Sequence, residues 1–278
     1  MGEKSVEKLK RRVIALLSDL GTRDYFVGAM KGVILSIAPR AVIVDITHDI
    51  PKFEVAGAGF VLLQAARYFP PETIFVVVVD PGVGGKRKCL LLTTKNGQMF
   101  IAPDNGVLTL VAETFGVKEI REITNRRFML PKISSTFHGR DVMAPVAAWL
   151  ASGKLPSEVG RIVKEMVRIK FPVAAARGGT LRGGVIYVDD FGNIITNIPK
   201  ELVKFSLGER LTLRVGRKKI SCIFGEKFSD VPAGGLICYI GSAGTVEIAE
   251  NLGSAQERLR IKTRERIIIE GSRCREEH

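Results

Sequence analysis

The stretch VIALLSDLGTRDYFVGAMKGVILSIAP, residues 13–39, carries the pattern that decides the fold. The apolar residues 13–17 predict a buried strand, which ends at the polar turn Ser18-Asp19-Leu20-Gly21. Residues 27–37 then show the apolar spacing of a helix that Pro39 closes. A strand, a turn and a helix in this order predict one unit of an α/β sheet.

The same unit recurs further along the chain. Residues 41–46 predict a strand, residues 55–68 a helix, and residues 73–79 a strand so continuously apolar that both of its faces should be covered. Strands that alternate with helices predict a mainly parallel sheet between helices. Residues 89–94 and 99–101 predict a hairpin around the turn Lys95-Asn96-Gly97. Two further helices are expected, at 108–115 and 142–150.

The pattern changes near residue 175, where strands follow one another without helices. We therefore predict an α/β N-terminal domain at 1–174 and a smaller all-β C-terminal domain at 175–278. The strands expected in the second domain are 184–188, 210–215, 219–223, 236–240 and 246–249.

Composition excludes several classes of protein. Apolar runs are far shorter than a membrane span, and the start MGEKSVEKLKRR lacks the apolar core of a secretory signal, so we expect a soluble, cytoplasmic protein. The net charge of +13 is concentrated in two terminal segments with interleaved Glu, and no base-stacking pattern accompanies it, so nucleic acid is not the expected partner. The high charge is equally compatible with an acidic ligand or with adaptation to high temperature.

The four cysteines show no short pairing, and histidines number only three, the last at the final residue. We therefore expect buried thiols and no metal site. The cysteines are Cys89, Cys222, Cys238 and Cys274, and the final histidine is His278.

Polar residues gather where the predicted strands end, which is where open α/β sheets bind their ligands. Asp19 is suited to accept the hydroxyls of a ribose, whereas Asp24 fits the capping of a helix. These strand-end residues are Asp19, Asp45, Thr47, His48 and Asp80.

The stretch VVVVDPGVGGKR, residues 76–87, follows the third strand with a glycine-rich loop. It matches neither phosphate-binding pattern, and Pro81 removes one backbone donor. Asp80 and Arg87 are placed to form an ion pair, which either faces a ligand or staples the loop. His138, in the polar turn before a predicted helix, is equally compatible with a ligand contact and a structural role.

Five motifs, in this order along the chain, closely resemble the SAM hydroxide adenosyltransferases. They are DITHDIP (45–51), VVDPGVG (78–84), APDNG (102–106), STFHGRD (135–141) and DDFGNIITNI (189–198). The resemblance extends over about residues 13–254. It implies hydrolysis of S-adenosylmethionine (SAM) to adenosine and methionine without a cofactor. It also implies a trimer whose sites form between the N-terminal domain of one subunit and the C-terminal domain of a neighbour.

The resemblance implies a role for each residue that matches a motif. Asp80, Arg87 and His138 match a set that handles the attacking water. We expect Asp80 and His138 to hold this water and remove or share its proton, while Arg87 orients Asp80 and favours the developing hydroxide. Asp19 matches the carboxylate that binds ribose. The remaining matches are Phe53 and Phe137 beside the nucleoside, Asp189 and Asn193 at the amino acid end of methionine, and, with weaker local similarity, Phe228 and Ser242 at adenine.

Related fluorinating and chlorinating enzymes share the scaffold but differ at the reacting centre. They carry Tyr where Asp80 and His138 stand, and they lack an arginine that matches Arg87. In the fluorinating enzyme a serine replaces Gly139 and an extra loop interrupts the hairpin. These differences favour water over halide. A halide-dependent enzyme, a sensor that binds SAM or adenosine without turnover, and a nucleic-acid-binding protein are the alternatives.

Overall fold

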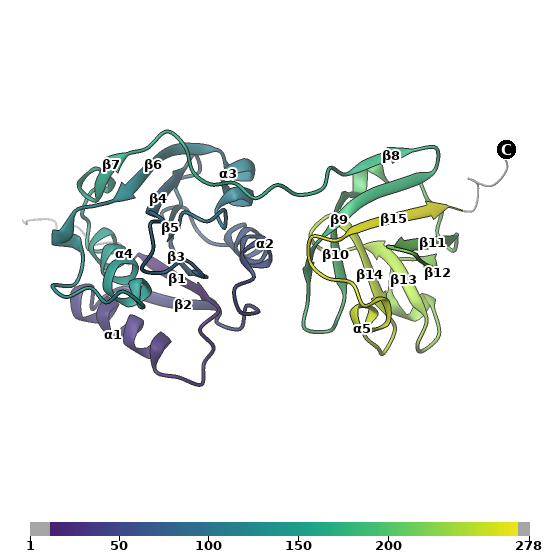
Figure 1. Ribbon diagram of the computed structural model, residues 1–278, viewed down its shortest axis with the longest axis horizontal. Helices are drawn as coiled ribbons and strands as arrows, with labels where there is room; N and C mark the ends of the chain where they lie inside the picture. The colour runs from purple at the N-terminus through teal and green to yellow at the C-terminus, as the bar shows by residue number, and fades with distance from the viewer. Residues whose placement is uncertain (1–11, 272–278) are drawn as a thin grey trace, which may run out of the picture. The chain divides into compact units, whose positions relative to one another are not determined.

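The structure, a computed structural model, describes residues 12–271. Expectations about the first eleven residues, Cys274 and His278 fall outside this range. The chain divides into two compact units, Met1–Ile169 and Lys170–His278, which are described separately. Figure 1 labels their elements.

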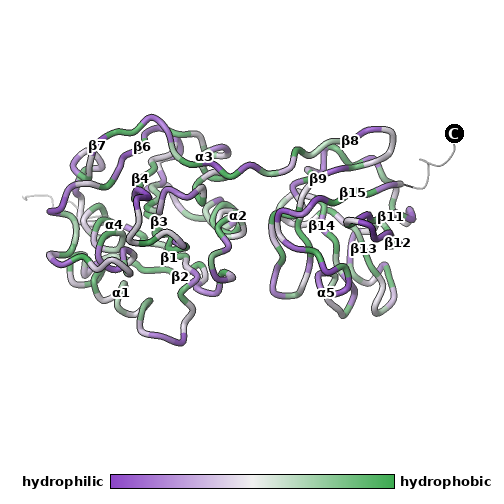
Figure 2. The backbone as a smooth tube through the Cα atoms, in the orientation of Figure 1, coloured by the Kyte–Doolittle hydropathy of each residue, from purple (hydrophilic) through white to green (hydrophobic). Residues whose placement is uncertain are grey.

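The N-terminal unit is built on a seven-stranded sheet of order β2-β1-β3-β5-β4-β6-β7. Its apolar strands β1 and β3 lie inside, and the hydropathy along them can be followed in Figure 2. The strands are β1 Val13–Ser18, β2 Val42–Thr47, β3 Ile74–Val78, β4 Cys89–Thr94, β5 Met99–Pro103, β6 Val117–Ile123 and β7 Gly160–Ile162.

Helices cover both faces of this sheet. Residues of α1 and α4 share one buried core with one face, and residues of α2 and α3 share a second core with the other (Figure 1). The helices are α1 Phe26–Ile37, α2 Val55–Ala66, α3 Thr109–Phe115 and α4 Ala144–Ala151, with short helical turns η1 Arg126–Phe128, η2 Gly139–Met143 and η3 Pro156–Glu158. The turn before α1 has no side-chain cap, so the predicted capping role of Asp24 is wrong.

The prediction of a mainly parallel sheet is also wrong, because the sheet is mixed. β2, β1, β3 and β5 pair in parallel, whereas β5, β4, β6 and β7 pair antiparallel. The β4–β5 hairpin reverses the chain through the predicted turn, and β6 and β7, which carry many charged residues, return beside it. Half of the sheet therefore lacks the helical crossovers that parallel strands need.

The described part of the C-terminal unit is a closed barrel with one short α-helix. The sequence predicted an all-β domain, but it predicted neither the closure of the strands into a barrel nor the helix. Seven strands follow one another in the order β10-β14-β13-β12-β11-β15-β9, and β9 also pairs with β10 to close the ring. The elements are β8 Ala175–Arg177, β9 Thr180–Val188, β10 Ile194–Pro199, β11 Arg210–Val215, β12 Lys218–Phe224, β13 Leu236–Ile240, β14 Thr245–Glu250, β15 Arg266–Gly271, α5 Ala255–Leu259, η4 Lys200–Leu202 and η5 Phe228–Asp230.

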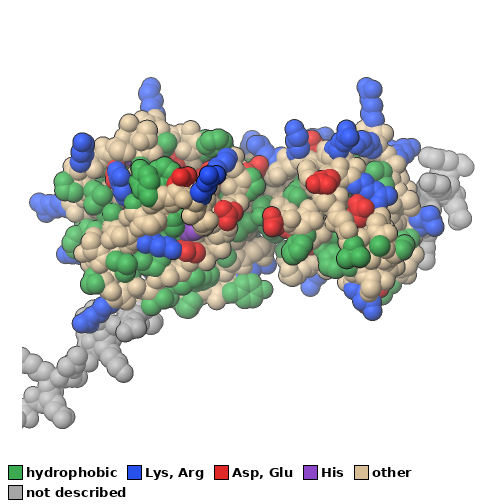
Figure 3. All heavy atoms as spheres, turned by 90° about the horizontal axis from the view of Figure 1, so that it is seen from below, with side chains coloured by type: hydrophobic (Ala, Val, Ile, Leu, Met, Phe, Trp, Pro, Cys, Tyr) green, Lys and Arg blue, Asp and Glu red, His purple; other side chains and the backbone are tan. Residues whose placement is uncertain are grey.

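Three further observations bear on the compositional predictions. Cys89, Cys222 and Cys238 are buried free thiols, as predicted for them. No helix within residues 12–271 is both long and apolar enough to cross a membrane. Figure 3 shows Lys and Arg scattered over the visible face of each unit, with Asp and Glu among them.

Candidate active site

Asp80, Arg87 and His138 form one connected group in the N-terminal unit. The Arg87 Nε donates to both carboxylate oxygens of Asp80 at 2.9 Å, and its Nη2 donates to Asp80 Oδ2 as well. The same Nη2 lies 2.8 Å from His138 Nδ1. The Asp80 and Arg87 side chains are only 6% and 11% exposed, so the ion pair is shielded from water. Such a fork fixes the carboxylate in one orientation.

The proton on His138 can be assigned from this contact. A guanidinium only donates, so Nδ1 must accept and a neutral ring carries its proton on Nε2. Burial, together with the nearby charge of Arg87, lowers the pKa of His138 below its ordinary value. For Arg87, burial acts to lower the pKa, but the hydrogen bonds to Asp80 raise it overall. The group therefore holds a charged Arg87 and a neutral His138 at neutral pH.

Backbone packing brings these residues together. Asp80 follows β3, and the glycine-rich loop after Asp80 lies against the segment that carries His138. The approach is so close that a Cβ atom at position 84 would come within 2.2 Å of the Ser135 carbonyl oxygen. The fully buried Asp141 anchors that segment, because it accepts the Ser134 amide at 2.7 Å and Arg140 Nε at 2.6 Å. The role of Asp141 was not assigned from the sequence, although it belongs to the STFHGRD motif.

His138 immediately precedes η2, a π-helical turn that continues into α4. Such turns are rare and are frequent at functional sites. The sequence predicted a regular helix from about residue 142 and gave no sign of this turn.

Asp19 and Phe53 lie beside this group. The backbone amide of Phe53 donates to Asp19 Oδ2 at 2.9 Å, and Phe53 is 67% exposed. A cavity of about 180 Å³ collects most of the residues predicted for this half of the site. Its lining includes Asp19, Phe53, Asp80, Phe137, His138 and Gly139.

A second group lies in the C-terminal unit. Asp189, Asn193 and Phe228 line a cavity of about 500 Å³, whereas Ser242 is not among its lining residues. Asp189 Oδ1 accepts the Asn193 amide at 2.8 Å, and Asn193 Nδ2 donates to Asp189 Oδ2 at 2.8 Å. Phe191, which was not among the predicted site residues, lines the same cavity and is 80% exposed. The sequence did offer a signal for Phe191, because an aromatic residue stands inside the polar turn motif DDFGN.

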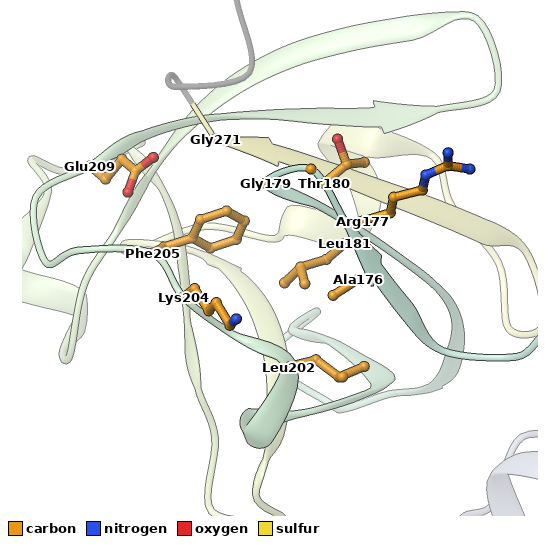
Figure 4. Close-up of a pocket in the computed structure, with 11 residues that line it drawn as sticks. Ala176, Arg177, Gly179, Thr180, Leu181, Leu202, Lys204, Phe205, Glu209 and Gly271 are labelled. Atoms are coloured by element: carbon orange, nitrogen blue, oxygen red, sulfur yellow. The ribbon is translucent and has the colours of Figure 1, made fainter.

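A third cavity, of about 190 Å³, lies near β8 and β9, and Leu181, Lys204 and Phe205 are among its lining residues (Figure 4). None of the predicted site residues lines it. Within residues 12–271, no group of three or more His, Cys, Asp or Glu is arranged to hold a metal ion.

Comparisons with known proteins agree with this division of the chain. Residues 14–160 match the SAM hydroxide adenosyltransferase N-terminal domain, and residues 183–268 match the corresponding C-terminal domain.

Relatives extend over nearly the whole chain. An (R)-S-adenosyl-L-methionine hydrolase from Methanocaldococcus jannaschii is 38% identical over 92% of this chain and 95% of its own length. A fluorinase from an Actinoplanes species is 32% identical over 86% of this chain and 91% of its own. The crystal structure of an uncharacterized conserved protein from Thermotoga maritima is 44% identical, with a TM-score of 0.87 over 92% of this chain and 99% of that one. Since the two family domains match in order and together span most of the residues, the chain belongs to the SAM hydroxide adenosyltransferase family, as the motifs predicted.

Proposed function

We propose that this protein hydrolyses S-adenosyl-L-methionine to adenosine and L-methionine. The observation that carries the proposal is the connected Asp80–Arg87–His138 group, in which Asp80 and His138 line a small cavity and Arg87 holds both of them without lining it. The relatives named (R)-S-adenosyl-L-methionine hydrolase, at 34–38% identity, support the same reaction. No cofactor is needed, because the sulfonium sulfur is already a good leaving group.

In the proposed reaction, water attacks the ribose 5′ carbon as the bond from that carbon to sulfur breaks. The sulfur leaves as the neutral thioether of methionine, and one proton passes from the water to Asp80 and then to solvent. Asp80 is the proton acceptor, because Arg87 holds its carboxylate while Oδ1, which accepts only the Arg87 Nε, retains a free lone pair. Arg87 stays protonated and favours the developing hydroxide electrostatically.

The structure changes the role that we assign to His138. With Nδ1 occupied by Arg87, the remaining ring nitrogen carries a hydrogen and donates rather than accepts. We therefore assign to His138 the task of holding the water oxygen through Nε2–H, so that a lone pair points to the reacting carbon. This leaves proton removal to Asp80 alone.

Substrate binding divides between the two units. Asp19 binds the ribose hydroxyls, and Phe53 and Phe137 flank the nucleoside. In the C-terminal unit, Asp189 and Asn193 hold the amino acid end, while Phe228 and Ser242 contact adenine and the exposed Phe191 adds a stacking surface. We propose a homotrimer in which these two sets come from neighbouring subunits, for which light scattering is the direct measurement. A metal-independent reaction and a cytoplasmic location complete the proposal.

Product analysis tests the reaction itself. Incubation of the full chain with SAM in chloride-free and fluoride-free buffer should release adenosine and methionine in equal amounts, and EDTA should not reduce the rate. Formation of a halogenated adenosine only when halide is added would replace the proposal with the halogenase alternative. Binding of SAM without any product after prolonged incubation would identify a sensor.

The pH dependence tests the protonation state of His138. Because the pKa of His138 lies below the ordinary value of 6.5, the neutral ring should persist into mildly acidic solution. We expect kcat/KM to stay nearly constant from pH 7.5 down to about pH 6.5, an ordinary histidine pKa, and to fall only below it. A rate that rises as the pH falls through this range would show that the imidazolium is the active form.

A further inference from the structure

A buried hydrogen bond joins the ends of β1 and β2 close to the candidate site. Ser18 Oγ and His48 Nδ1 lie 2.7 Å apart, and the two residues are only 1% and 3% exposed. On the other side of the ring, His48 Nε2 lies 3.1 Å from Asp45 Oδ1. The second carboxylate oxygen of Asp45, Oδ2, forms an ion pair with Lys31. The Nε2 contact lacks hydrogen-bond alignment, so it is the weaker of the two.

The charged groups around His48 indicate which atoms of Asp45, His48 and Ser18 carry protons. Partial burial acts to raise the pKa of Asp45, but Lys31 and His48 lower it overall, so Asp45 is charged at neutral pH. A carboxylate beside Nε2 favours a proton on that nitrogen, which leaves Nδ1 to accept from the Ser18 hydroxyl. Ser18 Oγ in turn accepts the Leu20 amide at 3.3 Å. Ser18 Oγ and His48 Nδ1 are then both satisfied, while His48 Nε2 keeps only the poorly aligned contact with Asp45.

The order Asp, His, Ser resembles a hydrolytic triad, but Ser18 is not placed to act as a nucleophile. Its side chain is fully buried, its oxygen is occupied by His48 and Leu20, and it is not among the residues that line the cavity. The Ser18–His48 hydrogen bond is therefore suited to position neighbouring residues and not to carry out a nucleophilic attack.

The residue next to Ser18 is Asp19, the proposed ribose-binding carboxylate. The loop that follows His48 returns to the same strand end, since the His48 carbonyl accepts the Gly21 amide at 2.7 Å and the Ser18 carbonyl accepts the Ile50 amide at 3.3 Å. The loop then delivers the Phe53 amide to Asp19 Oδ2 at 2.9 Å. The loop that His48 anchors therefore supplies the hydrogen bond that orients the Asp19 carboxylate.

We propose that His48 is a positioning residue for nucleoside binding: its bond to Ser18 sets the Asp19 carboxylate and the Phe53 backbone for the two ribose hydroxyls. This inference rests on the proposed function, because it takes adenosine as the bound group. His48 acts through Asp19 and touches neither the reacting carbon nor the water. Its loss should therefore weaken binding and leave the chemical step almost unchanged.

Two substitutions of His48 separate positioning from mere packing. Asparagine carries a polar atom where Nδ1 stands and can keep the bond to Ser18, whereas glutamine places its polar atoms where Nε2 stands and loses that bond. A single hydrogen bond of this kind corresponds to a change of roughly 3- to 10-fold in affinity. We expect calorimetric Kd values for adenosine, and KM for SAM, to rise by about this factor in His48→Gln and by less than about twofold in His48→Asn. Both variants lose the buried ring, so their melting temperatures should fall together, and kcat should stay near the parent value in both.

A double-mutant comparison completes the test. In an Asp19→Ala background, His48→Gln should change the affinity for adenosine much less than in the parent, because the carboxylate that it positions is gone. Ser18→Ala removes the same hydrogen bond without altering the ring, and it should reproduce the loss of affinity if His48→Gln does not fold. Equal affinities in His48→Gln, His48→Asn and the parent would overturn the positioning role while leaving the reaction intact. A parent protein that binds no adenosine would instead overturn the proposed function, and the positioning role with it.

Discussion

Replacing Asp80 by asparagine should reduce kcat by about 10²–10⁴-fold, the usual contribution of general-base assistance, while SAM still binds. Asparagine keeps the size of the side chain and one oxygen acceptor for Arg87. It removes the negative charge and the ability to take a proton from water. Single-turnover rates and calorimetric affinities for adenosine measure the two effects separately, and the affinity should change by only a few-fold.

Asp24→Asn is the matched control, because it makes the same chemical change at an exposed position that does not line the cavity. It should leave kcat and affinity at the parent values. A turnover rate near that of the parent in Asp80→Asn would exclude Asp80 as the proton acceptor. An equal loss in both variants would point to a general effect of charge instead.

The parts of the fold that the sequence predicted are those with strong local signals. The apolar run at 13–17 is β1, and the continuous apolar run before Asp80 is β3, buried along its whole length. The turn Lys95-Asn96-Gly97 joins β4 and β5, which pair antiparallel as a hairpin must. In each case a few neighbouring residues determine the structure without help from distant segments.

Sheet direction and barrel closure could not be predicted because they depend on pairing between distant segments. β6, with the sequence VKEIREI, is strongly charged, and its place beside β4 follows from long-range hydrogen bonds. In the C-terminal unit, the ring closes only because β9 pairs with both β10 and β15. β15, which begins at Arg266, was not among the strands expected from the sequence.

In the candidate site, too, contacts between nearby residues could be predicted from the sequence and contacts between distant segments could not. Asp80 and Arg87 stand seven positions apart, so a pair across one loop could be foreseen. Their contact with His138, 51 residues further on, is visible only in the structure, and the sequence alone left two roles open for that histidine. The buried bridge from Ser18 to His48 was missed for the same reason. Both contacts join residues that lie far apart in the sequence.

The glycine-rich loop after β3 illustrates how a motif can be misleading when its residues are considered without their surroundings. Its glycines suggested phosphate binding, which the spacing did not support. The structure provides another reason for Gly84: its backbone is left-handed, with φ of +76°, and it lies directly against the Ser135 carbonyl. The loop that carries Asp80 can approach the segment that carries His138 only because no side chain stands between them.

Gly84→Ala should therefore damage both stability and catalysis. A left-handed backbone costs an alanine about 1–2 kcal/mol, and the added methyl must push the Ser135 carbonyl away, so we expect the free energy of unfolding to fall by about 2–4 kcal/mol. The two loops would separate, Arg87 could no longer reach both Asp80 and His138, and turnover should fall by at least about 10²-fold even where the variant is fully folded. Urea denaturation and single-turnover rates measure the two losses. Gly82→Ala, in the same loop, is the matched control, because its methyl would meet side-chain atoms at ordinary contact distances, Arg87 Cγ at 3.4 Å and Asp80 Oδ1 at 4.0 Å, and its backbone is not left-handed. Equal stability and turnover in the two alanine variants would show that the close approach at Gly84 does not hold the active group together.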